Sequence, residues 1–250
     1  MRIEEKFVLI TGSARRVGAE LARAFAAAGA RLLLHCRNSR VEAEALVNML
    51  PGGAARHRVL QADLARPGEA LRLFSEAGRV DILINNAGIG EQKMIDETDD
   101  EWMMYVMNTN LGDPMRYIRE ALKIFLPKND GVIINISSVN GTRPFCGATY
   151  ASTKGAINTL TKNVAMRLID TNIRCNAVAP GATVTPAHLA NKAGEQPGGA
   201  EMLKYSGHFV YFPGPECYPM DQAYACLYLA SKMGRAVRGQ VIQVCNGAFL

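Results

Sequence analysis

Short runs of consecutive apolar residues recur along the chain, and in its first half they alternate with stretches of helical periodicity. The runs are rich in Val, Ile and Leu, which is typical of strands buried on both faces of a parallel sheet. Seven strands are expected, at residues 7–10, 31–35, 59–62, 81–84, 131–136, 173–178 and 240–244. Helices are expected at residues 19–29, 41–50 and around 70–77. This alternation predicts an α/β fold, with a parallel sheet of about seven strands.

The chain has 250 residues, a length that fits one large domain or two small ones. No linker-like composition divides it, so we expect a single domain over residues 1–250. The only long irregular stretch runs from residue 182 to residue 219 and is rich in Gly and Pro. A loop of that length in a compact domain is usually a functional lid, and we expect a substrate lid at about 186–213.

Composition and charge exclude several classes of protein. Apolar residues make up 48% of the chain and charged residues 20%, which is typical of a globular protein. The net charge is +5, but the basic residues are scattered, so no nucleic-acid partner is expected. No apolar run is long enough to cross a membrane, and the first residues do not resemble a signal peptide. The six cysteines lack metal-ligand spacing, which favours free thiols, no metal site and a cytoplasmic location.

A glycine-rich turn lies between the first strand and the first helix, at residues 11–18. This context favours a dinucleotide site over a plain structural turn, because the helix N-terminus offers free N–H groups to a pyrophosphate. Gly12 allows the tight turn, and Gly18 allows close packing of the helix on the sheet. The cofactor-binding candidates in the turn are Gly12, Ser13, Arg15, Arg16, Val17 and Gly18.

The end of the second strand bears on the choice of nucleotide. An NAD site usually has Asp or Glu there, whereas this chain has Arg37, Asn38 and Ser39 and no carboxylate. Arg37 suits a 2′-phosphate, and Arg15 is placed to approach the same group from the glycine-rich turn. We therefore expect NADP(H) to be preferred over NAD(H). The alternative is that both arginines are solvated surface charges.

Polar residues with catalytic potential follow the fourth and fifth strands. An Asn-Asn-Ala-Gly segment occupies residues 85–88, and Ser137-Ser138 follows the fifth strand. Tyr150 and Lys154 are four residues apart and share one face if the segment is helical. A phenol has a pKa of about 10, and a neighbouring ammonium lowers it, so that Tyr150 gains the ability to act as a general acid or base near neutral pH. A serine hydroxyl is suited to hydrogen-bond the substrate oxygen.

These motifs together resemble those of the short-chain dehydrogenase/reductase family over essentially the full chain. The matching residues are Gly12, Gly18, Asn85-Asn86-Ala87-Gly88, Asn110, Ser138, Tyr150, Lys154 and Pro180-Gly181. The resemblance implies a Rossmann-type doubly wound sheet, a nicotinamide cofactor and hydride transfer between a carbonyl and a secondary alcohol. It also implies a homo-oligomer, a homotetramer or a dimer.

The resemblance further implies a role for each matching residue. Tyr150 is the acid/base, Lys154 binds the nicotinamide ribose and tunes Tyr150, Ser138 orients the substrate carbonyl, and Asn110 holds a water of a proton relay. Further cofactor contacts are implied for Asp63, Leu64, Asn86, Ala87, Gly88, Pro180, Gly181, Thr183 and Thr185. Of these, Asp63 and Leu64 face the adenine, and residues 180–185 contact the nicotinamide carboxamide.

The chain departs from the family pattern at three places. Arg16 replaces the middle glycine of the turn, as in pteridine-reductase-like members, although Ser138 is retained where such members have Asp. The spacing from Ser138 to Tyr150 is one residue short, and counting from Ser137 restores it. We favour Ser138, because residues 135–138 match the family tetrapeptide. The tail carries Cys245-Asn246-Gly247 in place of Asp-Gly-Gly, which bears on subunit contacts.

The expected lid is rich in apolar and aromatic residues, which suits a bulky or flat carbonyl compound. The alternative is that these residues pack against the domain itself or a neighbouring subunit. The leading hypothesis is an NADP(H)-dependent carbonyl reductase or alcohol dehydrogenase. The alternatives are a pteridine-type reductase, suggested by Arg16, and a nucleotide-binding scaffold without turnover.

Overall fold

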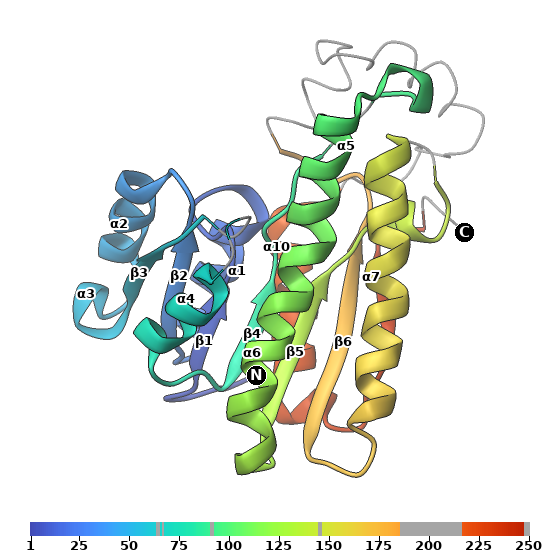
Figure 1. Cartoon of the computed structure of the whole chain (residues 1–250). Helices are drawn as coiled ribbons and strands as arrows, with labels where there is room; N and C mark the ends of the chain where they lie inside the picture. Colours follow the sequence, from blue (N-terminus) through green and yellow to red (C-terminus); the bar gives the residue numbers. More distant parts are fainter. Residues whose placement is uncertain (64–65, 67, 91–92, 145–146, 186–216, 248–250) are drawn as a thin grey trace.

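The computed structural model describes residues 1–63, 66, 68–90, 93–144, 147–185 and 217–247. These residues form a seven-stranded parallel sheet with helices on both faces, as the sequence predicts (Figure 1). The strands are β1 (Phe7–Ile10), β2 (Arg31–Cys36), β3 (Arg58–Gln61), β4 (Ile82–Asn85), β5 (Gly131–Ile136), β6 (Ile173–Pro180) and β7 (Val241–Val244). The helices are α1 (Arg16–Ala27), α2 (Arg40–Met49), α3 (Gly53–Arg56), α4 (Glu69–Ala77), α5 (Asp100–Met107), α6 (Asp113–Lys128), α7 (Ala148–Arg167) and α10 (Pro219–Ala230).

The strand order is β3-β2-β1-β4-β5-β6-β7, so the winding direction reverses between β1 and β4. Ligands of such sheets bind in the crevice beyond the carboxyl ends of the strands at this reversal. The parallel register puts Asn85 of β4 level with Asn135 of β5. The residues that follow β1, β4 and β5 therefore come together at one edge of the sheet.

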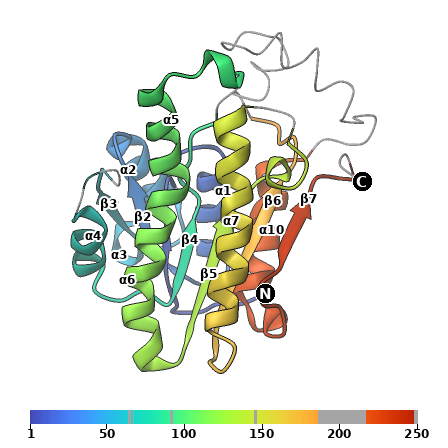
Figure 2. The same ribbon diagram turned by 45° about the vertical axis from the view of Figure 1, so that its right-hand side comes forward.

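Two apolar layers hold the helices to the sheet. Alternate strand residues such as Val8 and Leu32 face one layer, which includes α1, α2 and α10. The intervening residues, such as Leu9 and Leu33, face the other, with α4, α6 and α7. Figures 1 and 2 show α6 and α7 side by side across β4, β5 and β6. Because both strand faces are covered, the strands read as continuous apolar runs in the sequence.

The structure extends several of the expected elements and adds others. Helix α1 begins at Arg16 rather than Ala19, and β6 continues to Pro180 rather than Val178. Short turns of 3₁₀ helix lie at η1 (Ile95–Glu97), η3 (Val139–Gly141) and η4 (Lys232–Gly234), and a π-helical turn lies at η2 (Asn108–Gly112). Within the described ranges, no helix has the length and apolar character that a bilayer span needs.

Candidate active site

The glycine-rich turn connects β1 to α1 and is closed by contacts that only glycine permits. Gly12 has φ of +62°, and a Cβ there would lie 2.9 Å from Cα of Ala87. A Cβ on Gly18 would lie 2.2 Å from the carbonyl oxygen of Gly12. These approaches bring the turn, the start of α1 and the segment after β4 into direct contact, as the sequence predicts for both glycines.

The first turn of α1 is suited to bind an anion. Its N-cap residue, Arg15, makes no side-chain bond to the helix, and the first turn carries no acidic residue. Arg16 and Arg15 are exposed there, and Val17 is half-buried. Free N–H groups, a positive helix dipole and two cations fit the pyrophosphate of a dinucleotide.

His35, in β2, holds the glycine-rich turn through hydrogen bonds. Its Nδ1 accepts a hydrogen bond from the N–H of Gly12 at 3.3 Å, and its Nε2 lies 3.0 Å from the carbonyl oxygen of Ala62. Its own carbonyl accepts bonds from the N–H and the hydroxyl of Ser13. Burial lowers the pKa of His35 to about 4, so the ring is neutral with its proton on Nε2. The sequence signal for this residue was a polar side chain inside an apolar strand.

The segment after β4 is bonded directly to the turn. The side-chain amide of Asn86 donates to the carbonyl oxygens of Thr11 and Gly12, at 2.9 and 3.0 Å. The N–H groups of Asn86 and Ala87 both donate to the hydroxyl of Thr11 at 2.9 Å. Thr11 thus organises the junction, although sequence reasoning gave it no role.

Helix α7 is held against the sheet by polar contacts as well as apolar ones. Asn135 of β5 donates to the hydroxyl of Thr161 at 2.9 Å. The Ser137 hydroxyl lies 2.6 Å from Oδ1 of Asn158 and 3.1 Å from the carbonyl oxygen of Lys154. These bonds set the height of α7 along the sheet, and with it the position of the Tyr150–Lys154 pair.

Tyr150 and Lys154 lie together on α7, as their spacing predicts. The ammonium nitrogen of Lys154 is 5.5 Å from the centroid of the Tyr150 ring. It donates a hydrogen bond of 2.8 Å to the carbonyl oxygen of Ile136, at the end of β5. Lys154 is buried, and this burial lowers its pKa to about 8. An ammonium held in so dry a place interacts strongly with any charge that develops on the phenol.

The two serines after β5 have different surroundings. Ser137 faces α7 and is bonded to its backbone, as described above. Ser138 is the first residue beyond that contact, and its Oγ accepts a bond of 3.2 Å from the N–H of Asn140 at the start of η3. This difference favours Ser138 as the serine available to a substrate.

Asn110 lies in the π-helical turn η2, where the helix widens by one residue. Its Oδ1 accepts from the N–H of Ile89 at 2.8 Å, and its Nδ2 donates to the carbonyl oxygen of Ile89 at 2.9 Å. A Cβ on Gly88 would lie 3.3 Å from Oδ1 of Asn110 and 3.7 Å from Nζ of Lys154. The structure therefore brings Gly88, Asn110 and Lys154 together.

The segment after β6 borders the same edge of the sheet. The N–H of Gly181 donates to the carbonyl oxygen of Val244 at 3.0 Å, and the Thr183 hydroxyl lies 3.1 Å from the carbonyl oxygen of Gly181. Pro180 and Thr185 flank these residues, all within the range expected to meet the nicotinamide. The expected lid at 186–213 and Leu64 lie outside the described residues.

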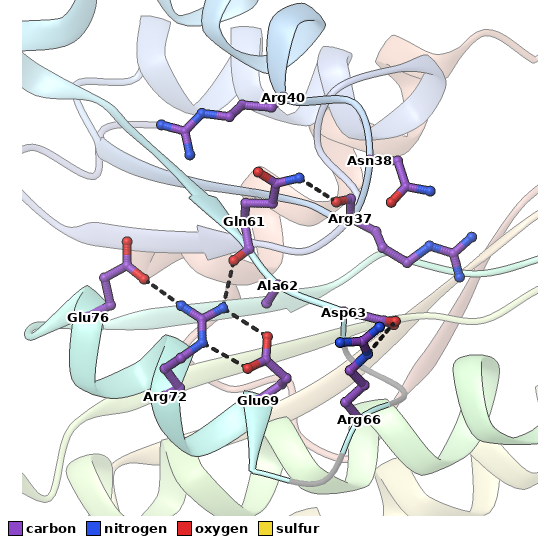
Figure 3. A pocket seen from close by; sticks show the side chains of 10 residues that line it. All are labelled: Arg37, Asn38, Arg40, Gln61, Ala62, Asp63, Arg66, Glu69, Arg72 and Glu76. Atoms are coloured by element: carbon purple, nitrogen blue, oxygen red, sulfur yellow. Dashed lines mark hydrogen bonds and ion pairs between the residues drawn. The ribbon is translucent and has the colours of Figure 1, made fainter.

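A charged pocket of about 490 Å³ lies beyond the ends of β2 and β3 (Figure 3). It includes Arg37, Asn38 and Asp63, which the sequence assigns to the adenosine half of the cofactor. The other lining residues are Arg40, Gln61, Ala62, Arg66, Glu69, Arg72 and Glu76.

Arg15 and Arg37 do not share a partner in this structure. Arg15 forms an ion pair with Glu42 of α2, and Arg37 donates to the hydroxyl of Tyr105 in α5 at 2.5 Å. Ser39 is the N-cap of α2 and makes no side-chain cap bond to it. The two arginines thus reach this end of the site from different elements, and only Arg37 lines the pocket.

Comparison with known proteins identifies the family of the chain. A family model described as short chain dehydrogenase matches residues 6–196. The chain belongs to the short-chain dehydrogenase family. It is 34% identical over 255 residues to 3beta-hydroxysteroid dehydrogenase 1 of Eggerthella lenta, covering 99% of this chain and 95% of that protein. It is 31% identical over 265 residues to versicolorin reductase stcU of Emericella nidulans, covering 99% and 97%. A solved short chain dehydrogenase/reductase family protein matches with a TM-score of 0.84 and 29% identity, covering 98% of both chains.

Membership makes this chain an oxidoreductase of the CH–OH/C=O type that uses a nicotinamide cofactor, and the site fits such a cofactor. The cradle at Gly12 and Gly18 leaves no room for larger side chains, as close approach to a dinucleotide requires. Arg16, in place of the family's middle glycine, has φ of +53°, the left-handed region that glycine favours. The described residues contain no group of three His, Cys, Asp or Glu suited to a metal ion.

Proposed function

We propose that this short-chain dehydrogenase is an NADP(H)-dependent carbonyl reductase or alcohol dehydrogenase in which Tyr150 and Lys154 carry the proton transfer. The observation that carries the proposal is the buried Lys154 ammonium, 5.5 Å from the Tyr150 ring centroid. When bound, the nicotinamide supplies or accepts the hydride. The chain must then supply or remove one proton at the substrate oxygen.

Tyr150 moves that proton. In reduction its phenol donates a proton to the forming alkoxide, and in oxidation the phenolate removes one from the alcohol. Lys154 stabilises the phenolate, and each unit by which it lowers the pKa of Tyr150 corresponds to about 1.4 kcal/mol. Its bond to the Ile136 carbonyl keeps the ammonium in place beside the ring.

Ser138 and Asn110 position the reacting groups. The Ser138 hydroxyl donates to the substrate oxygen, where negative charge develops during reduction. The Asn110 side chain is bonded to the backbone of Ile89, so it braces the loop after β4 while its turn of π helix faces Lys154. We assign the proton relay to this turn.

The remaining candidates form the cofactor site. We assign the pyrophosphate to the glycine-rich turn and the nicotinamide to residues 180–185 and to the segment from Asn86 to Gly88. We assign Asp63 to contact the adenine and Arg37 to bind the 2′-phosphate, with Asn38 and Ser39 as neutral hydrogen-bond donors beside it. The absence of a carboxylate in residues 35–39 supports NADP(H) over NAD(H).

We propose an apolar, bulky or flat carbonyl compound as the substrate. The sequence of residues 186–213 is rich in aromatic and aliphatic residues, as is usual for small-molecule sites that exclude water. Two relatives are named for steroid and versicolorin substrates, and each is matched over nearly its whole length.

We further propose a cytoplasmic homo-oligomer, a tetramer or a dimer. Exposed apolar side chains on the outer layer of helices, Met115 and Leu126 of α6 and Met166 of α7, support association. The buried free thiols of the described residues suit a reducing compartment. Light scattering of the purified protein tests the oligomer, and a monomer at micromolar concentration contradicts it.

Turnover of a carbonyl panel tests the chemistry. Oxidation of NADPH and NADH is followed with steroid ketones, quinones, simple ketones and a dihydropterin, the last arm testing the pteridine-type alternative that Arg16 raises. We expect turnover of a flat apolar ketone with NADPH, and a loss of about 10²–10⁴-fold in kcat for Tyr150→Phe. Tyr224→Phe, at an exposed position of α10, is the matched control and should be unchanged. Undiminished turnover by Tyr150→Phe refutes the mechanism.

A further inference from the structure

Arg37 is held at both ends by neutral groups. Its carbonyl oxygen accepts a bond of 2.8 Å from the side-chain amide of Gln61, in β3. Its guanidinium donates to the Tyr105 hydroxyl and lies 5.6 Å from the centroid of that ring. An exposed arginine on a strand end is thereby fixed between the sheet and α5.

The tyrosine that holds Arg37 is itself supported. The rings of Tyr105 and Trp102 lie 5.7 Å apart on α5, inclined at 50°. The Lys93 ammonium lies 5.5 Å from the centroid of the Trp102 ring, and Lys93 pairs with Asp99 at 3.6 Å. Tyr105 is therefore packed against Trp102, which in turn contacts Lys93.

The other arginines at this end of the site have acidic partners. Arg40 pairs with Glu44, Arg66 with Asp63, and Arg72 with both Glu69 and Glu76. Figure 3 shows Arg37 extending away from Arg40, to the opposite side of the pocket. Within the described part of the chain, Arg37 forms no ion pair with a carboxylate, and the hydrogen-bond partner of its guanidinium is the Tyr105 hydroxyl, although its charge also acts on the Asp113 carboxyl.

This difference in partners changes what each arginine offers an anion. A carboxylate offsets the guanidinium charge and competes with a phosphate for its donors. A phenol oxygen accepts one N–H, leaves the full positive charge and leaves donors of the guanidinium fork for another acceptor. Holding the side chain in advance also removes most of the conformational entropy that binding would otherwise cost.

We propose that Tyr105 is a positioning residue that sets cofactor specificity: it presents a charged, pre-ordered Arg37 to the 2′-phosphate of NADP(H). The proposal rests on the proposed NADP(H) preference. Tyr105 acts only through Arg37 and touches no reacting atom. Tyr105→Phe keeps the ring under the guanidinium and removes only the phenol oxygen, so it isolates the hydrogen bond.

A double-mutant cycle tests this role, with kcat/KM measured for NADPH and for NADH in four proteins: wild type, Tyr105→Phe, Arg37→Ala and the double variant. Arg37→Ala should lower the NADPH/NADH ratio by about 10–100-fold. Tyr105→Phe should lower the same ratio by roughly 3–10-fold, with kcat unchanged. In the Arg37→Ala background, Tyr105→Phe should have no further effect. Tyr224→Phe again serves as the control for losing a surface phenol and should not change the ratio.

Binding is followed independently of turnover. Trp102 is the only tryptophan in the chain and its ring lies 5.7 Å from that of Tyr105, so its emission reports NADPH binding at this place. The dissociation constant from that titration should rise by the same factor as the ratio falls. A wild-type ratio that does not favour NADPH overturns the NADP(H) preference, and this proposal falls with it. An unchanged ratio in Arg37→Ala overturns the assignment of Arg37 to the 2′-phosphate, and with it the role of Tyr105. If Arg37→Ala lowers the ratio, three results with Tyr105→Phe overturn only the role of Tyr105. These are an unchanged ratio, a raised ratio, and a fall of the same size in the Arg37→Ala background.

Discussion

The two ends of the site differ in burial and in the kind of bond that holds them. At the end that we assign to the nicotinamide, Asn110, Ser138 and Lys154 are buried, and their bonds run to backbone groups or neutral side chains. At the end that we assign to the adenosine, Arg37 and Arg40 are exposed, and ion pairs with carboxylates dominate. Ion pairs in water contribute little stability, whereas buried polar groups are costly to leave unpaired.

This contrast explains where function can change without loss of fold. Substitutions at the buried end disturb the sheet edge and the chemistry together. On the assignment proposed here, substitutions at the exposed end should alter which cofactor binds, because they change the charge of exposed side chains and leave the buried core intact. We therefore expect the first kind to lower kcat equally with either cofactor, and the second to change the cofactor ratio with kcat preserved.

After Tyr150→Phe, the largest effect is expected at Ser138. Ser138→Ala removes the donor proposed for the substrate oxygen and should lower kcat by about 10²–10³-fold, by the same factor with NADPH and NADH. Steady-state kinetics with both cofactors measures it. A change in the NADPH/NADH ratio would show that the two ends of the site do not act independently.

Ser137→Ala is the matched control at the neighbouring position. Its hydroxyl is bonded to Asn158 and to the Lys154 carbonyl, so its loss should cost about 1–3 kcal/mol in the free energy of unfolding. Its effect on kcat should be far smaller than that of Ser138→Ala, as measured on the folded fraction. The reverse order would make Ser137 the catalytic serine.

A second prediction concerns His35, the buried residue of β2 that bonds the turn at Gly12. Its pKa lies at about 4 in the folded protein against 6.5 in the unfolded chain, because burial disfavours the charged ring. Between these pH values the unfolded chain binds a proton that the native state does not, so stability rises with pH. The contribution is complete above pH 6.5 and is lost as pH falls toward 4, and it amounts to about 3 kcal/mol.

Urea unfolding between pH 4 and pH 7 measures this contribution. The difference in unfolding free energy between wild type and His35→Gln should change across that range, because glutamine does not titrate. Parallel curves for the two proteins would show that His35 does not stay neutral in the fold, and that the turn at Gly12 is held in another way.

A smaller effect is expected at the glycines that join the two ends. Gly18→Ala places a Cβ 2.2 Å from the Gly12 carbonyl oxygen and should destabilise the protein by about 1–3 kcal/mol. It should also weaken the binding of NADPH and NADH by the same factor. In Gly155→Ala, in α7, the new Cβ meets only the Gly141 carbonyl oxygen at 3.5 Å, so this variant should stabilise the protein by up to about 1 kcal/mol. Thermal unfolding compares them, and equal shifts would contradict the close packing at Gly18.

The sheet was predictable from the sequence because its strands are buried on both faces. Runs such as residues 7–10 and 131–136 are apolar throughout and match strands residue for residue. Helices α5 and α6 were not predicted. The π-helical turn at residues 108–112 interrupts their periodicity, and Pro114 and Pro127 lie within α6, so the local pattern gives a weak helix signal.

Only those parts of the site that lie within local sequence motifs were predictable. The pairing of Tyr150 with Lys154 follows from their spacing on one helix. The bond between Arg37 and Tyr105 joins residues 68 positions apart, and that between Gly12 and His35 joins the turn after β1 to β2. No local pattern contains such contacts, because they depend on how elements far apart in the sequence come together in the fold. The sequence likewise placed Arg15 near Arg37 but not its ion pair with Glu42.

The central claim is that Lys154 makes Tyr150 acidic enough to act as acid and base. The direct measurement is the pH dependence of kcat/KM for alcohol oxidation in wild type and in Lys154→Met. With Lys154 present, activity should rise with pH through an apparent pKa well below the value of about 10 for a free phenol. In Lys154→Met that rise should move toward about pH 10, with much lower activity at pH 7. Profiles with the same midpoint in both proteins would contradict the account.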